Sequence, residues 1–330
     1  MNNPKSINGL MRHLRDTGID IAGSRDKRLL INSGYFHAYK GYRFFRSPST
    51  KIPITNFSDL HQIIQYDSAL KAILYPKIMF IETALKSIVL ECILSGTNSE
   101  RLSDAYKKAI IGYTYVLQKG GPIKAAKKAQ QKCLSLQSHI QKSIEFAYSH
   151  NNPTVTHFYS GGTKHEEIPL WATFEILSMG DFGTLVSRLT DSIRRDISHE
   201  LGIDISLDGT YSLVYKYIFL LKDMRNAIAH NHVVYDTRFN KYTPSSLCKS
   251  YIESKLHCTH VSFNNIHDYI TLVVYFLYLL KIPKRENLAF INSIQRITKI
   301  YTTGLINDQI EGMTISRDFI PRMTTIKRYI

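Results

Sequence analysis

Three polar residues near the end of one apolar segment have side chains that could bind an anion and transfer a proton. Arg225, Asn226 and His230 lie within the stretch RNAIAH. A guanidinium can hold a phosphate through paired hydrogen bonds, and an imidazole can take up or release a proton near neutral pH. Together they form a minimal set for cleaving RNA without a metal ion.

The spacing of these residues does not identify a site by itself. An arginine followed five positions later by a histidine occurs twice, as Arg225/His230 and as Arg194/His199. The context separates the two pairs, because Arg225 ends an apolar helical pattern, whereas Arg194 lies in the charged segment SIRRDISHELG. We therefore expect Arg225/His230 to carry the chemistry, with Asn226 orienting or contacting them.

Helix geometry limits how this pair can act. Residues five apart on an ideal helix point about 140° apart, so Arg225 and His230 share no face unless the helix ends near Ala229 or the arginine bends round. A second copy of the site, supplied by a dimer, would also bring them together. Asn226 and His230 do share a face. Asn231 is suited to end the helix in a left-handed conformation.

A purely structural role is the alternative for the same residues. Arg225 and His230 could bond to the last carbonyl groups of their helix, or pair with Asp223 or Asp236. In that case they would stabilise the fold and take no part in a reaction.

The elements that must position these residues are helical. Apolar residues recur with helical spacing, whereas strand-like alternation is scarce, so we expect an all-α protein. We expect Pro76 to kink or divide its helix, and an interruption near residues 180–183. The predicted helices cover residues 5–18, 59–95, 105–117, 123–148, 168–189, 211–229, 246–257 and 266–281.

Charge and composition favour a nucleic acid partner. The chain has 330 residues, 42 Lys+Arg and 27 Asp+Glu, and a formal net charge of +15. Such an excess favours binding to a polyanion. The longest apolar run, residues 269–280, is too short to span a bilayer, and the first residues do not resemble a signal peptide. With four cysteines and no CxxC pair, we expect a cytoplasmic protein without membrane partners.

A second basic feature lies on the helix predicted over residues 123–148. Its side chains could follow a phosphate backbone, or could simply form a solvated helix face. Ile123, Ala126 and Leu134 belong nearer the other side of this helix. The residues of the basic face are Lys124, Lys127, Lys128 and Lys132.

Several aromatic residues are candidates for base stacking or for the core. Trp171 and Phe174 lie in an apolar segment, and we expect them in the core. Tyr35, Tyr39 and Tyr42 are flanked by basic residues and could stack on bases, but a packed lid over the helices is the better interpretation.

No metal or cofactor site is expected. His257, Cys258 and His260, together with Cys248, contain potential zinc ligands. Their spacing matches no familiar zinc pattern.

The chain resembles the Abi family of abortive-infection proteins, in particular its AbiD/AbiF-like group within the HEPN superfamily. Four segments carry the resemblance in the same order along the chain, and together they cover most of residues 5–285. The second segment contains a Glu-x-x-Leu motif at Glu82 and Leu85. The segments are LLINSGYFHAYKGYRFF (29–45), FSDLHQIIQYDSALKAILYPKIMFIETALKSIV (57–89), IPLWATFEILSMGDFGTL (168–185) and MRNAIAHNHVVYDTRF (224–239).

The resemblance implies a HEPN-like helical bundle with helical extensions, whose Arg-x4-His motif forms a ribonuclease site that is commonly completed by dimerisation. It also implies a toxin held in check by a small structured RNA. Arg225, Asn226 and His230 match the family signature. Many relatives have a second histidine directly after the first. Here Asn231 stands at that position, and we place the next histidine, His232, among the candidate RNA contacts.

We therefore expect three segments and one main activity. Residues 1–56 form an N-terminal helix and aromatic segment, 57–290 the Abi/HEPN-like helical domain, and 291–330 a basic C-terminal tail. The expected activity is metal-independent cleavage of RNA, which leaves a cyclic or 3′-phosphate and a 5′-hydroxyl, while DNA is not cut because it lacks the 2′-hydroxyl. The alternative is a non-catalytic RNA-binding module in which the same residues hold a partner RNA.

Overall fold

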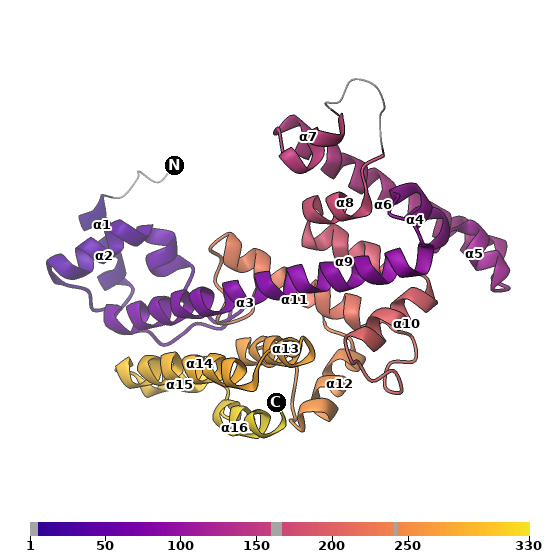
Figure 1. Ribbon diagram of the computed structural model, residues 1–330. Helices are drawn as coiled ribbons and strands as arrows, with labels where there is room; N and C mark the ends of the chain where they lie inside the picture. Colours follow the sequence, from indigo (N-terminus) through magenta and orange to yellow (C-terminus); the bar gives the residue numbers. More distant parts are fainter. Residues whose placement is uncertain (1–5, 160–166, 241–242) are drawn as a thin grey trace. The chain divides into compact units, whose positions relative to one another are not determined.

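The computed structural model describes residues 6–159, 167–240 and 243–330, and in these residues the protein is all-α (Figure 1). Extended pairing in this part of the chain is limited to isolated bridges, such as that between Asp20 and Asn56. The prediction of an all-α fold is confirmed. None of the described helices combines the length and the apolar run needed to cross a lipid bilayer.

The chain forms two compact units. Unit 1 consists of Met1–Met79 and Asp223–Ile330, and unit 2 of Phe80–Lys222. Two helices contribute to both units, α3 (Phe57–Thr97) and α11 (Leu213–Ala229). The helices within unit 1 are α1 (Ile7–Asp16), α2 (Gly23–Tyr35), the π-helix η1 (Phe36–Lys40), α12 (Ser246–Leu256), α13 (Ile266–Leu279), α14 (Lys284–Gly304), α15 (Asp308–Thr314) and α16 (Phe319–Tyr329). The helices within unit 2 are α4 (Leu102–Lys108), α5 (Tyr113–Gln118), α6 (Ile123–Ser149), α7 (Pro153–Tyr159), α8 (Leu170–Ile176), α9 (Met179–Arg188) and α10 (Asp191–Glu200).

Helix α3 extends beyond the predicted helix of residues 59–95 at both ends. The side chain of Asn56 accepts a hydrogen bond of 2.7 Å from the backbone N–H of Ser58, which caps the first turn. Pro76 was expected to kink or divide the helix, but α3 runs through it as one element. Pro76 and Ala72 are both exposed, so the carbonyl group that loses its partner can bond to water.

Other boundaries differ from the prediction in detail. Residues 105–117 fall into α4 and α5, which are separated by a short break. The interruption expected near residues 180–183 lies earlier, at Leu177 and Ser178, where the side chain of Ser178 caps α9. The helices of residues 123–148, 246–257 and 266–281 are confirmed as α6, α12 and α13.

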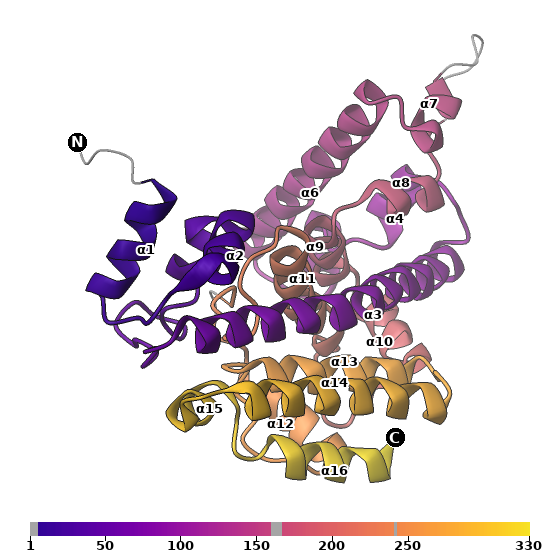
Figure 2. The same cartoon turned by 90° about the vertical axis from the view of Figure 1, so that its left-hand side faces the viewer.

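The core of unit 1 is built around the first half of α3 and the helices near the C-terminus. Figures 1 and 2 show α13 and α14 side by side. The ring of Tyr66 on α3 stacks on that of Tyr301 on α14, with centroids 4.5 Å apart, and its hydroxyl lies 3.2 Å from that of Thr298. Asp59 accepts a hydrogen bond of 2.6 Å from the N–H of Ile306. These contacts join the N-terminal and the C-terminal stretch of the chain within unit 1.

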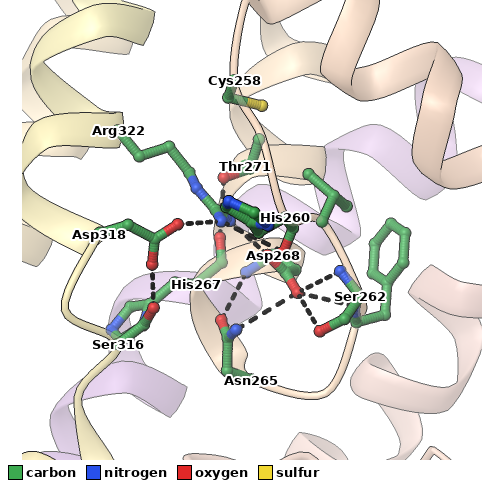
Figure 3. A network of polar contacts seen from close by, with 12 residues as sticks. Cys258, His260, Ser262, Asn265, His267, Asp268, Thr271, Ser316, Asp318 and Arg322 are labelled. Carbon is green, nitrogen blue, oxygen red and sulfur yellow. Dashed lines mark hydrogen bonds and ion pairs between the residues drawn. The ribbon is translucent and has the colours of Figure 1, made fainter.

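A buried ion pair fastens α16 to α13 (Figure 3). Arg322 of α16 pairs with Asp268 in the first turn of α13 and with Asp318, which directly precedes α16. Asp268 also accepts hydrogen bonds from the N–H groups of Ser262, at 2.9 Å, and Phe263, at 2.7 Å. Residues 291–330, expected as a basic tail, thus include α15, α16 and the second half of α14.

Replacing Arg322 with methionine is expected to destabilise the protein. The Arg322→Met change keeps most of the apolar packing but leaves Asp268, which is fully buried, without its counter-charge. Breaking a buried pair from one side costs about 3–5 kcal/mol, which a urea titration measures as free energy of unfolding. Arg317→Met is the control at an exposed arginine nearby. Equal losses in the two variants would contradict the structural importance of this pair.

Candidate functional site

The Arg–His motif lies at a sharply defined helix end. Asn231 has a left-handed backbone with φ of 53°, as the sequence predicts. The N–H of His232 donates to the carbonyl of Ala227 at 2.8 Å, and that of Asn231 to the carbonyl of Ile228 at 3.0 Å. This pair of hydrogen bonds is the Schellman motif, which supplies hydrogen-bond donors to the last carbonyl groups of a helix. The backbone that carries His230 and His232 is therefore fixed by local geometry.

The motif side chains fall into two contacting pairs. The guanidinium of Arg225 donates from Nη1 to Oδ1 of Asn226 at 3.1 Å, and both residues are half-buried. His230 and His232 are exposed, with ring centroids 6.0 Å apart. Arg225 thus bends toward Asn226, and α11 ends at Ala229.

One buried carboxylate holds the segment that follows the motif. Oδ1 of Asp67, on α3, accepts hydrogen bonds from the N–H groups of Val234 and Tyr235, both at 2.8 Å. Oδ2 accepts from the hydroxyl of Tyr42 and pairs with Nζ of Lys71, again at 2.8 Å in each case. The side chain of Asp67 is fully buried, so its charge depends on these donors for stabilisation.

Lys71 connects this carboxylate directly to the helix end. Its Nζ donates to Oδ1 of Asn231 at 2.9 Å while it pairs with Asp67. The residue whose left-handed backbone ends α11 is therefore held through its side chain as well. Burial, followed by the charge of Asp67, raises the pKa of Tyr42, so its hydroxyl stays protonated as a donor. Sequence reasoning missed this network; the signal available was a carboxylate and an amine four residues apart in an apolar helix.

A second buried carboxylate, that of Asp236, holds the chain two residues after Val234. Asp236 is fully buried and accepts bonds from Nε of Arg238, at 2.9 Å, and from the N–H of Arg46, at 2.6 Å. Arg238 also donates to the carbonyls of Gly41, at 2.7 Å, and Phe44, at 2.9 Å. The alternative in which Asp236 pairs with the motif residues is therefore not what the structure contains.

Aromatic residues divide between the core and the surface. Tyr39 and Tyr42 are buried and Tyr35 is half-buried, which supports a packed segment for these tyrosines. Phe174 is also buried, as predicted. Trp171, however, was expected in the core, and this prediction is wrong: 47% of its surface is exposed.

The basic face of α6 lies in unit 2 and is exposed along its length. Neighbouring positive charge, first from Arg188 and also from Lys128, lowers the pKa of Lys132, which shows that positive charges crowd at this point. Ala126 is buried, whereas Ile123 and Leu134 are exposed beside the lysines. The four lysines themselves are all exposed: Lys124, Lys127, Lys128 and Lys132.

The second Arg-x4-His pair has a different environment. Arg194 forms an ion pair with Asp191, three residues earlier on α10, and its guanidinium lies 6.0 Å from the ring centroid of Tyr215. His199 is exposed. Because Arg194 is already paired with a carboxylate, it is poorly placed to hold a phosphate.

Cys248, Cys258 and His257, considered above as zinc ligands, have other surroundings. Cys248 and Cys258 are buried, and burial raises the pKa of the Cys258 thiol to about 11. The ring of His257 stacks on that of Tyr329, with centroids 4.2 Å apart. Among residues 6–159, 167–240 and 243–330, no three His, Cys, Asp or Glu side chains are grouped so that they could hold a metal ion.

The comparison with known protein families gives one match. The sequence model of a family described as Abi-like protein matches residues 28–236, which is more than half of the chain. The matched range includes Tyr42, Asp67 and the whole Arg–His motif. No curated protein and no solved structure shows significant similarity to the chain.

Replacing Asp67 with asparagine should lower the free energy of unfolding more than the loss of one hydrogen bond to Asp67 does. The Asp67→Asn change leaves Lys71, whose side chain is 11% exposed, without its counter-charge. We expect a loss of about 3–5 kcal/mol in the free energy of unfolding, measured in urea. Tyr42→Phe is the control, since it removes one donor to the carboxylate and should cost about 1.5–3 kcal/mol. If the two variants lose the same amount, the charge of Asp67 is not what holds the segment.

Proposed function

The chain belongs to the Abi-like protein family, and on this basis we propose that it is an abortive-infection endoribonuclease that cleaves RNA without a metal ion. We assign it to the AbiD/AbiF-like group of the HEPN superfamily. The observation that carries the proposal is the end of α11. There, the exposed residues His230 and His232 follow the Arg225–Asn226 pair in the chain, and Asp67 holds the backbone just after them.

The reaction that suits these groups is an internal displacement at phosphorus. The 2′-oxygen of a ribose attacks the adjacent phosphorus and the bond to the 5′-oxygen breaks. His230 takes the proton from the 2′-hydroxyl or gives one to the leaving 5′-oxygen. Arg225 stabilises the charge that develops on the phosphate, and Asn226 holds its guanidinium in place. The products are a 2′,3′-cyclic phosphate and a 5′-hydroxyl.

The partners follow from the same proposal. We infer that the enzyme acts in the cytoplasm as a homodimer, in which the exposed ends of two α11 helices complete the site. A small structured RNA is proposed to keep it inactive. The net charge of +15 supports an RNA partner, and His232 lies close enough to His230 to contact the same phosphate.

The lysine face of α6 is proposed as an additional RNA contact. All four lysines are exposed, and the lowered pKa of Lys132 beside Arg188 reflects a local excess of positive charge. A polyanion would relieve that repulsion. This contact would bind RNA regardless of its sequence, because phosphates carry no sequence information.

Removal of the motif histidine should abolish cleavage and spare binding. For His230→Ala we expect the cleavage rate to fall about 10²–10⁴-fold, and for Arg225→Ala about 10²–10³-fold. The measurement is single-turnover cleavage of labelled RNA with analysis of the product ends, alongside the Kd for uncut RNA. A DNA strand of the same sequence should remain intact.

The second Arg-x4-His pair provides a matched control. Arg194→Ala/His199→Ala removes the same residue types at the same spacing and should retain wild-type cleavage. An equal loss in this control would refute the assignment to Arg225 and His230. If wild type binds RNA but cuts none, the protein is a non-catalytic RNA-binding module, and if DNA is cut, the mechanism is wrong.

Charge reversal on α6 should change the salt dependence of RNA binding. If all four lysines contact phosphates of a single strand, changing each to glutamate lowers the slope of log K against log salt by about 2.8, at about 0.7 per contact. The control reverses four exposed basic residues of unit 1, namely Lys281, Lys284, Arg296 and Lys299. An unchanged slope in the α6 variant would show that its lysines do not contact RNA.

A further inference from the structure

The side chain of Asn231 is held more firmly than its position at a helix end requires. A left-handed residue that ends a helix must tolerate a positive φ, which asparagine does, and its side chain needs no partner for that purpose. Yet Oδ1 of Asn231 accepts a hydrogen bond of 2.9 Å from Nζ of Lys71. Lys71 is itself paired at 2.8 Å with Asp67, which is fully buried. An exposed amide is therefore fastened to a charge in the interior of unit 1.

Asn151 ends a helix in the same way without such a contact. It follows α6 with a φ of 54° and is exposed, like Asn231. The N–H of Asn151 donates to the carbonyl of Tyr148 at 3.0 Å, and that of Asn152 to the carbonyl of Ala147 at 2.9 Å, which is again the Schellman motif. Among the described residues, the side chain of Asn151 has no hydrogen-bond partner. The backbone geometry alone therefore does not explain why the amide of Asn231 is held.

The contact with Lys71 determines which way the amide points. An ammonium group can only donate hydrogen bonds, so the atom of Asn231 that faces it must be the carbonyl oxygen. Oδ1 and Nδ2 are bonded to the same planar carbon atom, so Nδ2 points away from Lys71. Within the part of the chain that the structure describes, Nδ2 has no hydrogen-bond partner. Two N–H groups of an exposed residue are thus held in a fixed direction, available to a ligand.

A negatively charged acceptor suits these donors. The exposed residues His230 and His232 precede and follow Asn231 in the chain, and both rings can donate hydrogen bonds when protonated. The C-terminal end of a helix carries a partial negative charge, which disfavours an anion. A phosphate at the end of α11 therefore needs donors that outweigh this charge. Hydrogen bonds from N–H groups to phosphate oxygens are among the strong ones, because the acceptor is ionised.

We propose that the side-chain amide of Asn231 donates a hydrogen bond to a phosphate oxygen of RNA bound at the end of α11, and that Lys71 positions this amide. The inference rests on the proposed function, because the same RNA is the substrate. It adds a substrate contact at Asn231 and a positioning role for Lys71, which reaches the RNA only through Asn231.

Two substitutions remove the donor and keep the left-handed backbone. Asn231→Gly has no amide, whereas Asn231→Asp keeps an oxygen for Lys71 and replaces the donor with a charged acceptor. The ligand is a single-stranded 2′-O-methyl RNA, in which the 2′-oxygen required for cleavage is blocked, and anisotropy of a labelled strand gives its Kd. We expect the Kd to rise about 10- to 150-fold in Asn231→Gly, as for the loss of one hydrogen bond to a charged group, and further in Asn231→Asp.

Asn151 provides matched controls. Asn151→Gly and Asn151→Asp make the same changes of side chain and charge at the same kind of helix end, and should leave the Kd close to that of wild type. Urea titration of each variant measures its free energy of unfolding. We expect Asn231→Asp to be about as stable as wild type, since Lys71 retains an acceptor, although its affinity for RNA is the lowest. A purely structural role would lower affinity only together with stability.

A double-mutant cycle tests the positioning role of Lys71. Lys71→Gln should weaken RNA binding in the wild-type background and have no further effect on the Kd in Asn231→Gly, because Lys71 acts through the amide. Lys71→Arg keeps a cation with several donors and should retain most of the affinity. Equal effects of Lys71→Gln in the two backgrounds, or a loss in Lys71→Arg as large as in Asn231→Gly, would overturn the positioning role.

The outcomes separate this inference from the proposed activity. Equal Kd values in wild type, Asn231→Gly and Asn231→Asp, or equal losses in the Asn151 variants, would overturn the contact. Single-turnover cleavage of ordinary RNA is measured in parallel. If wild type cleaves RNA and the Asn231 variants bind it as wild type does, only the contact is wrong. Loss of affinity in the Asn231 variants without any cleavage by wild type supports the contact and refutes the nuclease, and absence of RNA binding overturns both.

Discussion

The carboxylate of Asp67 is the interaction on which the candidate site depends. An ionised group in an apolar interior is stable only when its oxygens are fully bonded, and here two backbone N–H groups, a phenol and an ammonium converge on it. That requirement determines where the chain lies after α11. Through Lys71 the same charge reaches Asn231, so the interior of unit 1 controls the backbone on either side of Asn231, where the exposed histidines lie.

A second buried carboxylate secures the same stretch of chain. Asp236 and Arg238 tie it to the carbonyl groups of the aromatic segment at Gly41 and Phe44. With two anchors in succession and a Schellman closure before them, the backbone has little freedom. Exposed side chains on such a rigid support can be held ready for a substrate, which is what catalysis of proton transfer requires.

Local patterns made much of this fold predictable. The all-α class, most helices and the left-handed Asn231 at the end of α11 depend on nearby residues, so the sequence shows them directly. The support of the site could not be predicted, because Asp67 lies 167 residues from Val234 in the chain. Trp171 was misplaced because α8 has seven residues, too few for a helical period to reveal which face points outward. Pro76 was expected to interrupt α3 because sequence does not show that its turn faces solvent.

The order in which the chain is made has a consequence for when the site can form. Unit 1 is discontinuous: its first part ends at Met79, and its second begins at Asp223, after the whole of unit 2. During synthesis on a ribosome, Asp67 emerges long before Val234 and Tyr235, whose backbone N–H groups it binds. Unit 2 can fold in that interval, while the carboxylate still lacks its backbone donors. The histidines are therefore brought into position late in translation, so a nascent chain does not yet carry an assembled site.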